Sequence, residues 1–199
     1  MVAQREPQHM TVEEWRKLER TNPDAKYEYI DGQVYLMSGG SLAHARISSN
    51  TLRAIEDALA DDSCYVYNSD ASVRLSESRY TYPNISISCD LGDQPTTEQL
   101  QVQAPRVVVE VLSDSTEGKD RIRKANLYHA CPSIQEYVLI ATKYQAVEVQ
   151  RRAGEDWTIH LFGLGDEIEL TSLGIRFPLS ILYRGTAVPG MLNGLDEPD

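Results

Sequence analysis

The chain has 199 residues, of which 41% are hydrophobic and 25% are charged, so it is long enough for one globular domain with a sizeable core. Its formal net charge of −11 argues against nucleic-acid binding through overall charge, because that binding requires lysine and arginine to displace counterions. No run of about eighteen apolar residues predicts a transmembrane helix, and residues 1–10 lack the apolar centre of a signal peptide. These features predict a cytoplasmic protein without a membrane partner.

The three cysteines, Cys64, Cys89 and Cys131, are an odd number at wide spacings. They fit neither a disulfide framework nor a zinc site. We therefore expect reduced, partly buried thiols in a reducing compartment.

The N-terminal part of the chain predicts a helix, a hairpin and a second helix. Residues 1–9 form a loose lead-in, after which Thr11 and Glu14 match a capping box at the start of a helix that runs to about residue 20. The Asp31-Gly32 pair separates two β-prone runs, residues 26–30 and 33–37, which is typical of a β-hairpin. The apolar residues between 42 and 60 keep helical spacing.

The middle of the chain alternates strands and one further helix. Short strands are predicted at residues 64–68, 71–75 and 85–89. The run 106–112 is the most apolar strand, and a helix from about 117 to 130 separates it from a strand at 136–140. The order of helix, three strands, helix and strand predicts a mixed α/β fold.

The C-terminal part predicts β structure and then a tail. Residues 146–151, 156–161 and 166–170 are separated by Gly-containing turns, as in a β-meander. From about residue 185 the chain is acidic and bears Gly and Pro, so we expect residues 185–199 to fray. Residues 10–184 are thus predicted to form a single domain.

One carboxylate interrupts the most apolar strand. Glu110 stands within the run Arg106-Val-Val-Val-Glu-Val-Leu112, and an unpaired buried carboxylate costs several kcal/mol. Glu110 is therefore expected to face a polar cavity, bind a metal or pair with a cation.

Lys124 is the cation that the predicted helix offers to Glu110. It lies about two turns into the helix, one i, i+4 step from Asp120, and it shares a face with Tyr128. It also belongs to the densest basic cluster of the chain, with Lys119, Arg121 and Arg123, which suits a phosphate substrate. The alternative is that Asp120 and Lys124 form an exposed helical pair.

An ordered set of residues resembles one bacterial family. The set comprises Glu28, Ile30-Asp31-Gly32, His44, Tyr82-x-Asn84, Glu110-Val-Leu-Ser113, Thr116, Asp120-Arg121, Lys124, Tyr128 and Glu136-Tyr137. It is similar to the Uma-two family of restriction endonuclease-like proteins, a branch of the PD-(D/E)XK nuclease-like superfamily. The resemblance covers residues 10–184 and implies a restriction-endonuclease-like mixed sheet flanked by helices.

The resemblance implies a site for Mg²⁺ or Mn²⁺ and a DNA substrate. Glu110 would be the acidic metal ligand, joined by the backbone carbonyl of Val111. The lysine that normally follows two residues later would fall at Leu112, and Lys124 on the next helix occupies its place. Glu28 and His44 would be accessory groups that reach the same pocket.

This sequence departs from the family pattern at Asn84, where an aspartate is expected after the proline. An asparagine oxygen can still ligate a metal, but the site loses one negative charge, so weaker Mg²⁺ binding and weaker activation of water follow. The resemblance therefore implies a Mg²⁺-dependent DNA endonuclease that is weakened or inactive, for which a homodimer would suit cleavage of two strands.

Two other functions remain open from the sequence. The first is a non-catalytic module that keeps the nuclease-like fold and binds nucleic acid or protein through the basic helix. The second is a small-molecule hydrolase that uses His44 and Glu110, although no nucleophile motif supports it. Glu28 could equally be a surface charge, and His44 a solvated residue at a helix start.

Overall fold

The structure, a computed structural model, describes residues 9–37, 39–59, 64–112 and 119–190, without the side chains of residues 119–121. Within these ranges the helices are α1 (Val12–Thr21), α2 (Leu42–Ala58) and α3 (Lys119–His129), with 3₁₀ turns η1 (Leu91–Asp93) and η2 (Leu179–Ile181). The strands are β1 (Tyr27–Ile30), β2 (Gln33–Leu36), β3 (Tyr65–Asn68), β4 (Ser72–Ser76), β5 (Arg79–Thr81), β6 (Ile85–Ser88), β7 (Gln101–Val102), β8 (Pro105–Val111), β9 (Glu136–Ile140), β10 (Val147–Ala153), β11 (Asp156–Phe162), β12 (Glu167–Leu170) and β13 (Ile175–Pro178).

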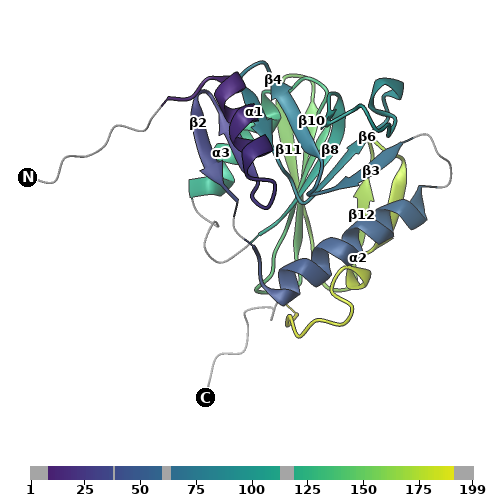
Figure 1. The fold of residues 1–199 in the computed structure, drawn as a ribbon. Helices are drawn as coiled ribbons and strands as arrows, with labels where there is room; N and C mark the ends of the chain where they lie inside the picture. Colours follow the sequence, from purple (N-terminus) through teal and green to yellow (C-terminus); the bar gives the residue numbers. More distant parts are fainter. Residues whose placement is uncertain (1–8, 38, 60–63, 113–118, 191–199) are drawn as a thin grey trace, which may run out of the picture.

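A six-stranded sheet in the order β11-β10-β9-β8-β6-β3 forms the centre of the molecule (Figure 1). Strand β8 is parallel to β9 and antiparallel to β6, and α3 lies in the connection between the parallel pair. The carboxyl ends of β8 and β9 therefore meet the beginning of β6 at one edge of the sheet. This topology brings residues 84 and 110 together although they lie far apart in sequence.

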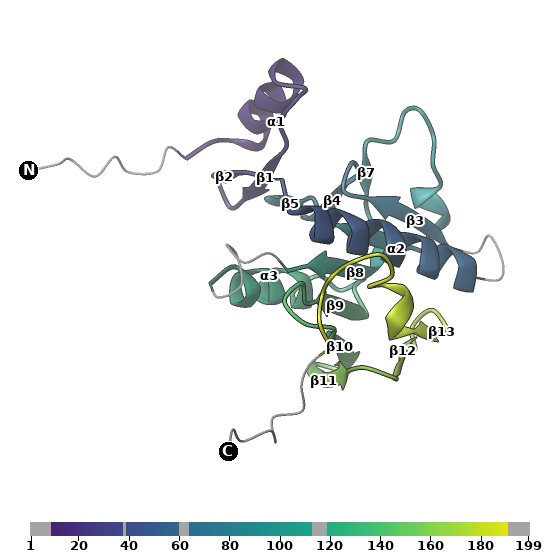
Figure 2. The ribbon, with the colours of Figure 1, turned by 90° about the horizontal axis from the view of Figure 1, so that it is seen from below.

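The two faces of the central sheet carry different layers, and Figure 2 shows α2 and α3 on opposite sides of β8. The odd-numbered residues of β8 pack with α2, β12 and β13, whereas Val108 packs with α3 and with the five-stranded sheet that contains β1 and β4. Side chains alternate across a strand, so Glu110 shares the face of Val108. The sheet thereby directs this carboxylate towards α3.

A second sheet in the order β2-β1-β5-β4-β7 covers part of that face. Strands β1 and β2 pair antiparallel around Asp31 and Gly32, and both turn residues have positive φ, the backbone conformation that Asp-Gly favours. The capping box predicted at Thr11 and Glu14 is present at the start of α1. Trp15 anchors α1 by stacking on Tyr80 of this sheet.

Two predictions for the C-terminal part are wrong in detail. Strands β9, β10 and β11 follow one another as a meander, but β12 leaves it and pairs with β13, a strand that was not predicted. Residues 185–190 do not fray, because Val188 is buried and the Pro189 carbonyl accepts a hydrogen bond from the Gln145 amide. Short apolar strands do not specify their partners, so only tertiary packing decides these details.

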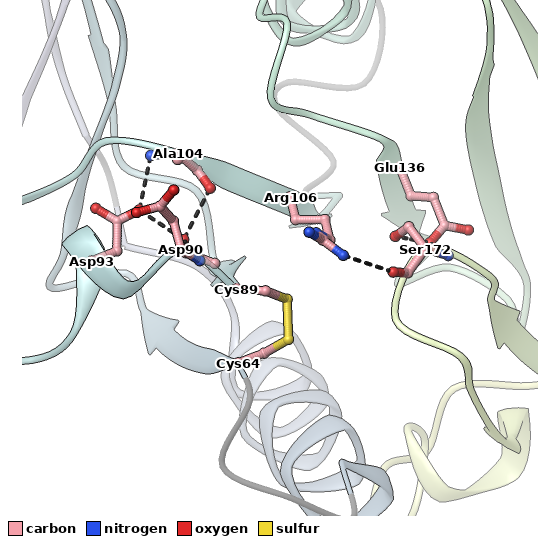
Figure 3. Close-up of a disulfide and its surroundings, with 9 residues drawn as sticks. Cys64, Cys89, Asp90, Asp93, Ala104, Arg106, Glu136 and Ser172 are labelled. Atoms are coloured by element: carbon pink, nitrogen blue, oxygen red, sulfur yellow. Dashed lines mark hydrogen bonds between the residues drawn. A yellow bond between two sulfur atoms is a disulfide. The ribbon is translucent and has the colours of Figure 1, made fainter.

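The expectation of three reduced thiols is also wrong. Cys64 and Cys89 form a disulfide that links the ends of the paired strands β3 and β6 (Figure 3), while Cys131 is a buried free thiol. The pairing of Tyr65 with Ser88 places these two cysteines side by side. Because the two cysteines are far apart in sequence, their spacing gave no sign that they are neighbours. A cytoplasmic location stays a prediction.

No helix in the described ranges is both long and apolar enough to cross a membrane.

Candidate functional site

Glu110 lies near the carboxyl end of β8 and is 8% exposed. Its Oε1 accepts hydrogen bonds from Lys124 Nζ at 2.9 Å and from the Tyr128 hydroxyl at 2.7 Å. Both donors come from one face of α3, four residues apart, which is the spacing of neighbours on a helix. The carboxylate that interrupts the apolar strand is therefore paired with a cation.

Glu28 brings a second buried carboxylate to the same lysine. Its Oε1 lies 3.2 Å from Lys124 Nζ and accepts a longer hydrogen bond, 3.4 Å, from the Tyr82 amide. Strand β1 supplies Glu28, so the cluster joins both sheets through α3. Two carboxylates and one ammonium group give the cluster a net charge of −1 when all three are ionised.

Burial and mutual attraction act against each other on these pKa values. Burial raises the pKa of Glu28, and the negative charge of Glu110 raises this pKa further. The positive charge of Lys124 lowers the same pKa but does not cancel the effect of burial. For Lys124, burial alone would lower the pKa, but the two carboxylates outweigh it and raise the pKa above its ordinary value. Lys124 therefore stays protonated at neutral pH and acts as a fixed positive charge rather than a base.

Tyr128 is a member of the site for which the sequence predicted no role. Its i, i+4 spacing from Lys124 was the signal that could have indicated one. Its ring is buried against Tyr137, with 4.9 Å between centroids. Burial, followed by the charge of Glu110, raises the pKa of its hydroxyl well above 10.0, so the hydroxyl remains a donor. Because Tyr128 and Lys124 both bind Oε1, they orient the Glu110 carboxylate.

Replacing Tyr128 with phenylalanine should lower the free energy of unfolding by about 1.5–3 kcal/mol, because the hydrogen bond to a buried charge is lost. Urea unfolding followed by circular dichroism measures this change. The matched control is Tyr80→Phe, because Tyr80 is also a buried residue but its hydroxyl has only a 3.5 Å contact with Arg16, and its loss should cost less than about 1 kcal/mol. Equal losses in the two variants would contradict an orienting role for Tyr128.

Asn84, Val111 and His44 form the other side of the site. Asn84 stands just before β6, and its Oδ1 accepts a hydrogen bond from the Val111 amide at 2.8 Å. Its Nδ2 lies 3.3 Å from His44 Nε2. The Ser41 side chain caps the start of α2 and so fixes the turn that carries His44.

Burial lowers the pKa of His44 below 6.5, although the nearby Glu110 carboxylate acts in the opposite direction. The imidazole is therefore neutral at pH 7 and able to accept a proton. His44 approaches from the α2 face of the sheet, whereas Lys124 approaches from the opposite face. The predicted site residues meet around the end of β8, and their catalytic roles stay predictions.

The oxygen atoms at this end of β8 are the type of ligand that a hard cation prefers, but few of them belong to charged side chains. The part of the chain that the structure describes has no group of three or more His, Cys, Asp or Glu side chains placed to hold a metal ion. The expected set of Glu110, Asn84 and the Val111 carbonyl contains only one carboxylate. Ser86 lies on the same sheet face, and its buried hydroxyl has no hydrogen-bond partner among the described residues, so the site has further polar capacity.

Two other buried carboxylates have complete sets of partners and serve the fold. Glu136 receives hydrogen bonds from Arg151 and from the amides and hydroxyls of Thr171 and Ser172. Asp93 binds the Ser88 hydroxyl and two amides of the following loop. Figure 3 shows Asp93 beside Ala104 and Glu136 beside Ser172. By contrast, only Oε1 of Glu110 has hydrogen-bond partners among the described residues.

Some predicted residues lie outside what the structure describes. These are Ser113 and Thr116, together with the side chains of Lys119, Asp120 and Arg121. The Arg123 guanidinium stacks over the Tyr35 ring at 4.1 Å, so this member of the basic cluster contacts β2.

Comparisons with known proteins agree with the fold. A crystal structure of "a putative nuclease belonging to DUF820" from Anabaena variabilis ATCC 29413 matches with a TM-score of 0.63 and 19% identity, over 80% of this chain and 90% of that one. Two Synechocystis sp. (strain ATCC 27184 / PCC 6803 / Kazusa) proteins also match. The protein slr1290 is 35% identical over 87% of this chain and 90% of its own length, and sll1609 is 30% identical over 75% and 86%.

The α/β architecture is thus shared with that crystal structure. A family model described as "Putative restriction endonuclease" matches residues 12–180. The chain belongs to this family, Uma2, and the family resemblance inferred from the sequence is confirmed.

Proposed function

We propose that this protein is a Mg²⁺- or Mn²⁺-dependent endonuclease that hydrolyses phosphodiester bonds of DNA, weakened by asparagine at position 84. The observation that carries the proposal is the buried cluster of Glu110, Lys124 and Glu28 at the end of β8. A structural ion pair could pair one carboxylate with one lysine. A second buried carboxylate leaves an excess negative charge, which favours the binding of a cation beside the cluster.

In this proposal Glu110 holds the cation through Oε2, because Lys124 and Tyr128 already bind Oε1. Asn84 Oδ1 and the Val111 carbonyl supply the remaining protein oxygens, and Mg²⁺ commonly keeps waters in its other positions. When bound, the cation polarises the phosphate and lowers the pKa of a bound water.

The other side chains act on charge and protons. Lys124 stabilises negative charge that develops on the phosphate, because its raised pKa keeps it protonated. His44, neutral at pH 7, accepts a proton from the attacking water or orients that water. Glu28 holds Lys124 in place from the second sheet. The charged cluster, rather than the net charge of −11, would recognise the phosphate.

A binding module that has lost catalysis is the second candidate, and one contact favours it. Asn84 Oδ1 already accepts a hydrogen bond from the Val111 amide, so in this arrangement the asparagine supports the backbone. Such a protein would bind DNA or a protein without requiring a metal.

Nicking of supercoiled plasmid in Mg²⁺ or Mn²⁺ tests the proposal. We expect slow nicking by the parent chain, abolished by chelation and reduced at least about a hundredfold in Glu110→Gln and in Lys124→Ala. Circular dichroism ensures that each variant is folded. No cleavage by the parent and none by Asn84→Asp, with plasmid binding that chelation does not change, would instead establish the binding module.

A further inference from the structure

Strand β11 forms one end of the central sheet, as Figure 2 shows at the end of the series β8, β9, β10 and β11. It has seven residues, whereas the other edge strands of the two larger sheets, β2, β3 and β7, have four, four and two. Its pairing with β10 runs from Asp156 to Phe162 without a bulge. An edge strand presents a row of amide and carbonyl groups to any strand that can pair with it.

This edge lacks most of the features that usually prevent such pairing. Charged side chains (lysine above all), proline and bulges protect exposed edges, yet Asp156 at the first position is the only carboxylate in β11, and the run Trp157-Thr-Ile-His-Leu-Phe162 contains no lysine, proline or bulge. Ile159 and Leu161 lie on one face of the strand and are 63% and 75% exposed. A long, regular and apolar edge with no pairing strand among the described residues indicates that something covers it.

We propose that β11 pairs antiparallel with β11 of a second copy of this chain, and that the two central sheets join into one. Pairing of a strand with itself in the antiparallel sense is two-fold symmetric, as closed dimers require. Centring the symmetry axis on Ile159, the middle of the strand, lets all seven residues pair. Leu161 then faces Trp157 of the partner subunit, and Thr158 faces the partner's His160.

The charges of the strand agree with this register. The only carboxylate of β11, Asp156, lies opposite Phe162 of the partner subunit, so no like charges face each other across the axis. Each subunit carries a net charge of −11, and added salt screens their repulsion. The dimer should therefore strengthen with ionic strength, unlike an interface held by ion pairs.

Sedimentation of the full chain over a range of concentrations tests the pairing. We expect a dimer that Ile159→Lys dissociates, with a rise of at least about a hundredfold in Kd, because apolar burial is lost on both subunits and two ammonium groups meet at the axis. Leu100→Lys is the matched control, since Leu100 is 82% exposed and lies outside β11. A parent chain that is monomeric at every concentration, or a dimer that both variants weaken equally, overturns the proposal.

Cysteine cross-linking tests the register without relying on destabilisation. Ile159→Cys places two thiols at the axis, so mild oxidation should give a covalent dimer on a non-reducing gel. In the same register the two cysteines of Leu161→Cys are about four residues apart along the strands, near 13 Å, and should not cross-link. The native cysteines do not interfere, because Cys64 and Cys89 are paired and Cys131 is buried. Cross-linking of Leu161→Cys but not Ile159→Cys would refute this pairing.

Discussion

Replacing Lys124 with methionine should lower the free energy of unfolding at pH 8 by about 3–5 kcal/mol, because two buried carboxylates lose their shared cation. The ammonium group lies 2.9 Å from Glu110 and 3.2 Å from Glu28. Methionine preserves most of the apolar volume, so the loss reports on charge rather than on packing. Urea unfolding followed by fluorescence and circular dichroism gives the value.

The same variant should become more stable as the pH falls towards 5. The pKa of Glu28 is already raised above 4.5 by burial, and removal of Lys124 raises it further. A carboxyl group with a higher pKa in the folded state takes up its proton preferentially there, so stability is lost as the pH rises above 4.5 and through the folded-state value. Part of the loss measured at pH 8 should therefore be recovered at pH 5.

Lys26→Met is the control for both measurements. Lys26 pairs with Asp70 at the surface, and such pairs contribute at most about 1 kcal/mol. A loss in Lys124→Met that is no larger than in Lys26→Met, or that does not change between pH 8 and pH 5, would mean that the cluster is not the buried charged unit described here.

Replacing Asn84 with aspartate should tighten Mg²⁺ binding at least about tenfold and increase plasmid nicking, because affinity rises with the number of charged ligands. The new carboxylate can still accept the hydrogen bond from the Val111 amide. On its other side an oxygen replaces the amide nitrogen that lies 3.3 Å from His44 Nε2. Titration calorimetry with Mg²⁺ and the nicking assay measure the two effects.

A second readout of this variant does not depend on catalysis. Without metal, the aspartate should raise the pKa of His44, which burial lowers in the parent, and NMR titration of the imidazole follows that shift. Asn126→Asp is the charge-matched control, because Asn126 is exposed on α3 and should change neither quantity. If Asn84→Asp raises the pKa of His44 but leaves Mg²⁺ binding unchanged, position 84 is not a metal ligand and the endonuclease proposal loses its ligand set.

Local patterns predicted most elements of the fold. The capping box at Thr11 starts α1, and the alternation of Ile85 and Ile87 with serines marks β6. The missed strands β5, β7 and β13 have two to four residues, and no turn signal or apolar alternation in the sequence singled them out. Their existence depends on partners elsewhere in the chain, and the same holds for the disulfide between Cys64 and Cys89.

The candidate site could be predicted where a charged residue interrupts an apolar strand. A carboxylate in an apolar strand requires a partner, which indicated Glu110, and helical spacing offered Lys124. Tyr128 also has helical spacing from Lys124, but it gave no signal in the sequence, because a buried tyrosine is common in proteins. The engagement of Asn84 by the Val111 amide had no local signal, because it depends on how β6 and β8 pair.

By itself, the sequence determined most of the succession of helices and strands and the need of Glu110 for a polar or charged partner, because periodicity and the cost of desolvation act within a few residues. The tertiary structure alone decided that Glu28 shares Lys124, that Asn84 supports Val111 and that β11 is an edge strand of the sheet that the described residues form. These relations depend on strand order and register, for which the chain carries no short-range signal. The physical reason is that contacts across a sheet join residues that are far apart along the chain, and such contacts produce no periodic pattern in the sequence.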